Sequence, residues 1–111
     1  MSIIRNETKS SVLCEEYEVC SSLVSQLRGL MFRLRKKALL FVFPEERIFS
    51  IHSLFVFFPF IAIYADSNRR VVDVAHVKPF TPLFRPRAPA RYLIEIPEPK
   101  GFVERGDLLS W

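Results

Sequence analysis

The residues of this chain that could do chemistry are a few basic or ionisable side chains inside apolar segments. Arg33 closes the segment "GLMFR", and His52 lies in the apolar run "IHSLFVFFPF". His76 ends the alternating run "VVDVAH", while Arg91 and Glu95 lie in the segment "ARYLIEIP". Placing a charged or polar group among apolar side chains is costly unless a partner satisfies it. These five residues are therefore the candidates for a ligand-binding site.

Arg33 is the best single candidate for binding an anion. The stem of an arginine can pack against an apolar block while its planar guanidinium faces a carboxylate or a phosphate. Together with His52 and Arg91, it could line a pocket for a small anionic molecule or for an anionic group of a peptide or protein partner. An internal ion pair between Arg33 and Glu95 is the structural alternative, because such pairs also stabilise folds.

His76 shares a predicted strand face with Val72 and Val74, and we expect this face to point into the protein. Such a position would bring His76 toward His52. Histidine changes its charge near neutral pH, so either ring could bind a ligand or transfer a proton. A purely structural role for both histidines is the alternative.

The patterns that support an enzyme are not found in the sequence. Cys14 and Cys20 have no histidine beside them and no third cysteine to complete a zinc site. No Gly-x-Ser-x-Gly motif occurs, and three glycines in the chain are too few for a phosphate-binding loop. Glu15, Glu16 and Glu18 are typical of a solvated strand edge. We expect a non-catalytic protein without a metal or a cofactor, and an enzyme of unknown reaction is the less favoured alternative.

The positive charge of the chain is concentrated in its middle. Residues 28–91 hold twelve Lys or Arg against four Asp or Glu, whereas each flanking segment carries two more acidic than basic residues. Two basic runs, "RLRKK" (33–37) and "RPRAPAR" (85–91), could share one face that binds RNA or another polyanion. The residues of this alternative site are Arg35, Lys36, Lys37, Arg85 and Arg87, with Phe32, Phe80 and Phe84 for stacking. A solvated loop would also explain "RLRKK".

The elements that position these residues follow from composition and periodicity. At 111 residues and 50% hydrophobic, the chain has the size of one domain, residues 1–111, in which residues 1–11 are expected to be a polar lead-in. Eleven Phe against three Gly favour strands, because half-buried pleated surfaces suit aromatic side chains. Ser21 and Ser22 can cap a helix that extends to about Arg33, and this is the only helix that the periodicity predicts.

Alternating or continuous apolar patterns predict strands in the rest of the chain. The predicted strands cover residues 12–20, 38–43, 48–58, 60–65, 69–77, 91–96 and 107–111. Residues 66–68 are expected to form a hairpin turn, and residues 78–90, which hold four of the eight prolines, a connection. These elements predict a β-rich α+β fold, with a curled or partly closed mixed sheet and one short helix packed against it.

The apolar run of residues 48–65 has the length of a short membrane span, which needs about 18 residues. Ser50, His52 and the central Pro59 instead favour two buried strands, since proline interrupts helical hydrogen bonding. The polar opening "MSIIRNETKSSV" is unlike a secretory signal. We therefore expect a cytoplasmic protein with reduced thiols and no membrane partner.

Six strings of the sequence occur in a familiar order. They are "GLMFR" (29–33), "LLFVF" (39–43), "IHSLFVFFPF" (51–60), "VVDVAHVKPF" (71–80), "ARYLIEIP" (90–97) and "GDLLSW" (106–111). In order and spacing they resemble the family known as domain of unknown function 192, also called uncharacterised protein family 0127, and the "IHS" form is similar to its archaeal branch. The resemblance covers nearly the whole chain from about Val12. It implies a compact, β-rich α+β domain and no particular activity.

Overall fold

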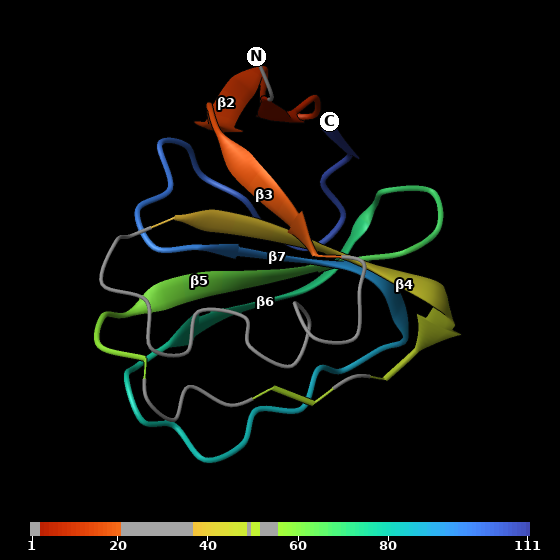
Figure 1. Ribbon diagram of the computed structural model, residues 1–111. Coiled ribbons are helices and arrows are strands. Elements are labelled where there is room, and N and C mark those ends of the chain that lie inside the picture. Colours follow the sequence, from red (N-terminus) through yellow and green to blue (C-terminus); the bar gives the residue numbers. More distant parts are fainter. Residues whose placement is uncertain (1–2, 21–36, 49, 52–55) are drawn as a thin grey trace.

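The computed structural model describes residues 3–20, 37–48, 50–51 and 56–111, and the regular elements of this part are strands. They are β1 (Ile4–Asn6), β2 (Ser11–Cys14), β3 (Tyr17–Cys20), β4 (Ala38–Arg47), β5 (Phe60–Ala65), β6 (Val71–Val77), β7 (Ala90–Ile96) and β8 (Leu109–Ser110). Strands β3-β4-β7-β5-β6 form one sheet, in that order, and β2-β1-β8 form a second, smaller sheet (Figure 1). Neither sheet closes into a barrel.

The predicted α+β fold is wrong for the described part of the chain. That part is built from strands alone and folds as two open sheets, not as one curled sheet with a helix against it. The physical reason is that the central strands are apolar on both faces, so each face of the large sheet needs its own cover. The helix expected between Ser21 and Arg33 lies outside the described residues.

The core occupies both faces of the five-stranded sheet. One cluster gathers on the face that carries Leu39, Phe41, Tyr64 and Leu93, together with the aromatic residues Phe43, Phe58 and Phe60. The other cluster joins Leu40, Ile63, Ile94 and Ile96 to Ile4, Leu13 and Leu109 of the small sheet. The small sheet therefore covers one face of the large sheet, as Figure 1 shows at the top of the molecule.

Strand β7 lies at the centre of the large sheet. It pairs antiparallel with β4 on one side and with β5 on the other. Its residues from Leu93 to Ile96 are all buried, because alternate side chains enter the two core clusters. A strand at the predicted position 91–96 is thus confirmed, but neither of its faces is open to solvent, and even Glu95 is buried.

The hairpin of β5 and β6 is also confirmed. Its turn is held by Asp66, whose side-chain Oδ1 accepts hydrogen bonds from the amides of Asn68 (2.9 Å) and Arg70 (3.0 Å). Arg69 adopts a φ of 63° within this turn. Short polar side chains that bond the backbone two residues further on are typical of such turns.

The N-terminal residues are more than a polar lead-in, which corrects the prediction for residues 1–11. Ile4 and Asn6 of β1 are both fully buried. The side-chain Nδ2 of Asn6 donates to Asp107 Oδ2 at 2.8 Å, and Lys9 Nζ donates to both oxygens of Asp107 at 2.7 and 2.8 Å. Burial favours a higher pKa for the Asp107 carboxyl, but these hydrogen bonds and that from the Glu104 amide hold the pKa below its usual range.

Three predicted strands have different bounds in the structure. The segment 12–20 is split at Glu15 and Glu16 into β2 and β3, which belong to different sheets. Strand β4 continues past Pro44 to Arg47, with an irregular register to β7 after Val42. Residues 56–59 are irregular, and within the predicted strand 48–58 only a single bridge from Ile51 to Phe84 is described.

No helix among the described residues is long and apolar enough to span a membrane.

Candidate functional site

Arg91 and Glu95 lie on the same strand, β7, and on the same face of the large sheet. Arg91 is half-buried, and its Nε donates a hydrogen bond to the carbonyl of Phe43 at 2.8 Å. This bond fixes the inner side of the guanidinium. A backbone carbonyl is uncharged, so this hydrogen bond does not neutralise the charge of Arg91.

Glu95 is the most unusual carboxyl group of the described residues. It lies opposite Leu39 on β4 and Ala62 on β5, and its side chain is only 5% exposed. Burial raises its pKa to about 8, because the charged form loses its hydration. The same burial effect, followed by the charges of Glu95 and Asp73, raises the pKa of Tyr64. Glu95 is therefore mostly protonated at neutral pH.

His76 does not occupy the inward position expected from the sequence. It is exposed, and it is the one exposed residue of β6. Val72 and Val74, which were expected on the same inward face, do pack against the core, but against different clusters, because the register of β6 to β5 is irregular next to Val71. Arg33 and His52 lie outside the described residues. The structure thus places Arg91 and Glu95 on one face of β7, about 13 Å apart along the extended strand, and leaves the predicted five-residue site untested.

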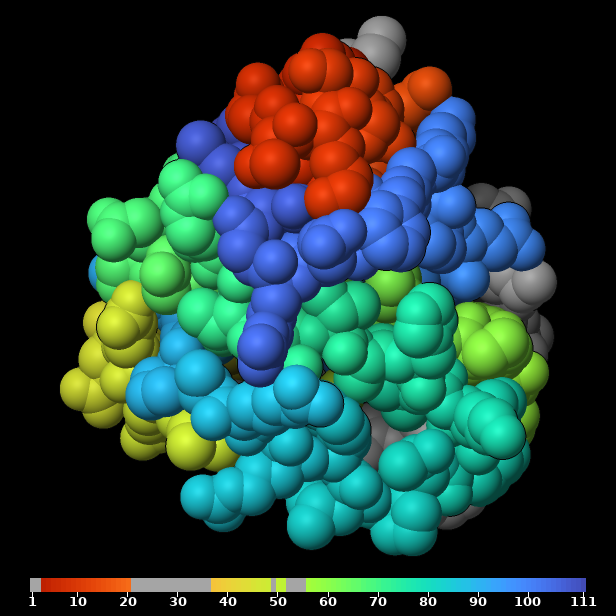
Figure 2. Space-filling model, turned by 180° about the vertical axis from the view of Figure 1, so that it is seen from behind, coloured from red at the N-terminus to blue at the C-terminus, as the bar shows by residue number. Residues whose placement is uncertain are grey.

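The connection between β6 and β7, residues 78–89, carries three cations, Lys78, Arg85 and Arg87. We call it the basic connection. Lys78, Arg85 and Arg87 are exposed, and residues 78–91 contain no Asp or Glu. In the space-filling view the connection forms a continuous band across the bottom of one face (Figure 2).

The basic connection has a defined backbone even though it contains no regular strand. Phe84 and Ile51 exchange two backbone hydrogen bonds, of 2.9 and 2.7 Å. The amide of Arg87 donates to Asp73 Oδ2 at 2.9 Å, and the ring of Phe84 lies 6.0 Å from that of Tyr64. These contacts pin the middle and the end of the connection to the core. Its side chains are thus presented from a fixed position.

Exposed aromatic side chains accompany these cations. Phe80 is 51% exposed and Phe57 52% exposed, and their rings meet edge to face with centroids 6.0 Å apart. Leu83 is 66% exposed. Phe84, which was expected to be available for stacking, is instead half-buried against the core. Of the three predicted stacking residues, Phe80 alone is seen to be exposed, and Phe32 lies outside the described residues.

The other predicted basic run is described only at its end. Lys37 is exposed and forms an ion pair with Glu18 at 3.6 Å. Arg35 and Lys36 lie outside the described residues, so a common surface for "RLRKK" and "RPRAPAR" stays a prediction.

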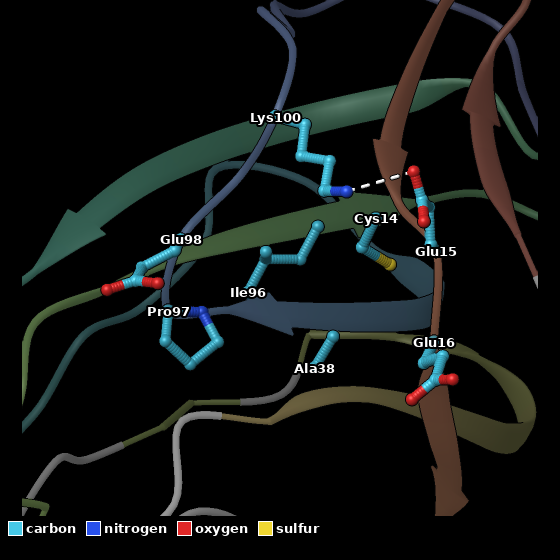
Figure 3. Close-up of a pocket in the computed structure, with 8 residues that line it drawn as sticks. All are labelled: Cys14, Glu15, Glu16, Ala38, Ile96, Pro97, Glu98 and Lys100. Atoms are coloured by element: carbon cyan, nitrogen blue, oxygen red, sulfur yellow. Dashed lines mark ion pairs between the residues drawn. The ribbon is translucent and has the colours of Figure 1, made fainter.

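A hollow of about 320 Å³, which was not predicted from the sequence, lies beneath the link between β2 and β3. Ala38, Ile96 and Pro97 supply apolar lining, and Glu16 and Glu98 approach from opposite sides (Figure 3). Lys100 pairs with Glu15 at 2.9 Å across its upper edge. The hollow forms where the link that carries Glu15 and Glu16 lies close to the segment that carries Glu98 and Lys100. These two segments are brought close by strand pairing, and no local sequence motif indicates it.

Cys14 contributes a buried thiol to the same hollow. It is 6% exposed, and burial raises the pKa of this thiol. A thiol that is disfavoured as thiolate is a weak nucleophile. Within the described ranges, no group of three His, Cys, Asp or Glu residues is arranged to hold a metal ion.

Comparison with known proteins shows a family by sequence and a shared fold by structure. A family model described as DUF192, Uncharacterized ACR, matches residues 4–109. The UPF0127 proteins of Pyrococcus horikoshii and Pyrococcus furiosus are 39% and 35% identical, over 98% and 96% of this chain and 98% and 95% of their own length. A crystal structure of a protein of unknown function from Novosphingobium aromaticivorans superimposes with a TM-score of 0.85 at 19% identity, over 98% of this chain and 84% of that one.

Proposed function

The chain belongs to the DUF192 family, whose description assigns no activity, and from its own surface we propose that it is a non-catalytic binding module for an anionic group. The ligand is a small anionic molecule or an anionic group of a larger partner. The observation that carries this proposal is the basic connection with Arg91, where four cations occur over residues 78–91 without a carboxylate. We place the protein in the cytoplasm, in keeping with two cysteines that remain thiols.

Fixed cations on an anchored loop favour binding over mere solubility. The four cations of residues 78–91 outnumber the carboxylates of Asp73 and Glu46, which lie near Arg87 and Arg91, and such a surplus creates a local positive potential that attracts anions. Arginine adds a planar fork that matches the oxygens of carboxylates and phosphates. The described anchors of the connection are backbone amides and the ring of Phe84, so the exposed side chains of Arg85 and Arg87 are not what holds the loop in place.

A catalytic role has less support from the described residues. The thiol of Cys14 is buried with a raised pKa, and His76 is exposed on a face that contains no buried acid. Glu95 has a pKa of about 8 and is 5% exposed, so it lies in the core as a neutral acid and is not presented to a substrate.

Tripolyphosphate is a suitable first probe of this surface. In a titration followed by the amide signals of the ¹⁵N-labelled protein, we expect shifts concentrated in residues 78–91. The double variant R85Q/R87Q should bind at least about tenfold more weakly, since the loss of even one hydrogen bond to a charged group costs about 1.5–3 kcal/mol. The fold should persist, because Arg87 anchors the loop through its backbone amide and not through its side chain.

The matched control is R105Q, which removes one exposed arginine outside the basic connection. Its affinity should equal that of the wild type. Shifts spread evenly over all exposed Lys and Arg positions, or equal weakening by R105Q and R85Q/R87Q, would show a nonspecific charge effect and contradict the proposed site.

A further inference from the structure

We propose that the anionic partner is a single-stranded nucleic acid and that Phe80 provides a surface on which one of its bases stacks. This inference rests on the proposed function, because the phosphates of the strand would be the anionic groups bound by the basic connection. It adds a second recognition element, an aromatic ring placed among the cations.

The arrangement of rings and charges fits a single strand better than a small anion. Phe80 follows Lys78 by two residues and precedes Arg85 by five, and all three are exposed. A single strand offers alternating phosphates and flat bases, and proteins bind it by combining a basic track with aromatic stacking. In a duplex the bases are stacked inside and cannot reach a protein ring. A small anion without a flat ring would not stack on the exposed pair of Phe57 and Phe80.

The backbone of Phe80 gives independent support. Its φ is 59°, in the left-handed region, which bulky side chains rarely adopt. Residues held in sparsely populated conformations cluster at functional sites, because there the strain serves a purpose. A glycine would fit this position without strain, yet the chain carries an aromatic ring that is half exposed. The position therefore combines an unfavourable backbone conformation with a half-exposed aromatic ring.

The strain also makes a clean test variant. Phe80→Gly removes the ring and suits the positive φ, so the variant should fold at least as stably as the wild type. The matched control is Phe102→Ala, which removes another exposed ring beside a cation, with Lys9 Nζ 5.4 Å from its centroid. Phe102 lies in the segment before β8, and Figure 2 shows this segment away from the basic connection.

The experiment compares two ten-nucleotide strands by fluorescence anisotropy: a mixed-sequence single-stranded RNA, and an abasic strand with the same number of phosphates. The wild type should bind the RNA more tightly than the abasic strand. Phe80→Gly should weaken RNA binding by roughly 5- to 100-fold, the effect expected for loss of one base stack, and should leave abasic binding unchanged. Phe102→Ala should bind both strands as the wild type does.

Equal affinity of the wild type for the two strands, or RNA binding by Phe80→Gly at wild-type strength, would overturn the stacking inference while leaving anion binding intact. Co-sedimentation with vesicles of phosphatidylcholine and phosphatidylserine is run beside it. Vesicle binding that depends on Phe80, without RNA binding, would also overturn it and assign the surface to a membrane. If neither strand nor tripolyphosphate binds, the proposed function itself fails.

Discussion

Replacing Phe41 by alanine lowers the free energy of unfolding by about 3–5 kcal/mol, the range for truncating a buried phenylalanine. Phe41 is 4% exposed on β4, and its ring stacks on that of Phe43 with centroids 6.4 Å apart. It faces the core cluster that also contains Leu93 of the central strand β7. Removal of the ring would leave a cavity between β4 and the other residues of the cluster. Chemical denaturation followed by tryptophan fluorescence and circular dichroism measures the change.

Phe102→Ala is the control, because Phe102 is 64% exposed and its ring adds little to the core. We expect it to change the free energy of unfolding by less than about 1 kcal/mol. A Phe41→Ala variant as stable as Phe102→Ala would mean that β4 does not pack as described, and the two-faced core would have to be revised.

Raising the pH from about 5 to about 8 destabilises the wild type by up to roughly 1.4 kcal/mol per pH unit through Glu95 alone. The folded-state pKa of Glu95, about 8, exceeds its ordinary value of 4.5. Between these values the folded protein keeps a proton that the unfolded chain loses, so the contribution is fully present below pH 4.5 and is lost as the pH rises through 8. Glu95→Gln, which mimics the protonated acid, should remove this dependence.

The free energy of unfolding is measured at several pH values between 5 and 9 for the wild type and for Glu95→Gln. The effect of Glu95 is the difference between their two slopes of free energy against pH. Glu16→Gln, a change at an exposed glutamate, should retain the wild-type slope. If Glu95→Gln and the wild type have parallel pH profiles, or if the variant is the less stable protein at pH 8, Glu95 is ionised in the folded state and paired with a cation.

The parts of the fold that the sequence predicted best are those governed by local patterns. The turn at Asp66 and the flanking strands β5 and β6 follow from turn chemistry between apolar runs, and both are confirmed. The connection of residues 78–90 is confirmed because its prolines lack the amide that a strand needs. Strand β7 was also found, since "RYLIEI" is continuous in β-forming residues.

The parts that failed depend on pairing between distant segments. Ile4 and Asn6 are buried because β8 and the loop around Asp107 return to the N-terminal hairpin. No pattern within residues 1–11 indicates that contact. The same holds for the division of residues 12–20, where the chain passes from the small sheet to the large one. Apolarity of both faces of the central strands was visible, but which segment covers each face was not.

The candidate site shows the same limit. Composition located the basic connection, and it could identify Arg91 and Glu95 as ionisable groups in an apolar strand. It could not show that Phe84 packs inward while Phe80 is exposed, because both are phenylalanines in one proline-rich segment. His76 was wrongly expected to point inward, because β6 packs against the core on both of its faces and His76 is its one exposed residue. Whether a side chain is buried depends on the whole fold and cannot be inferred from the residue type alone.

The salt dependence of polyanion binding tests most directly whether the basic connection is the anion-binding surface. For a ten-nucleotide single-stranded RNA, the logarithm of the binding constant should fall linearly with the logarithm of salt concentration, by about 0.7 for each phosphate neutralised. The triple variant K78Q/R85Q/R87Q should have a slope smaller than that of the wild type by about two units. A triple variant with the wild-type slope, or a wild type that does not bind at about 50 mM salt, would contradict the account.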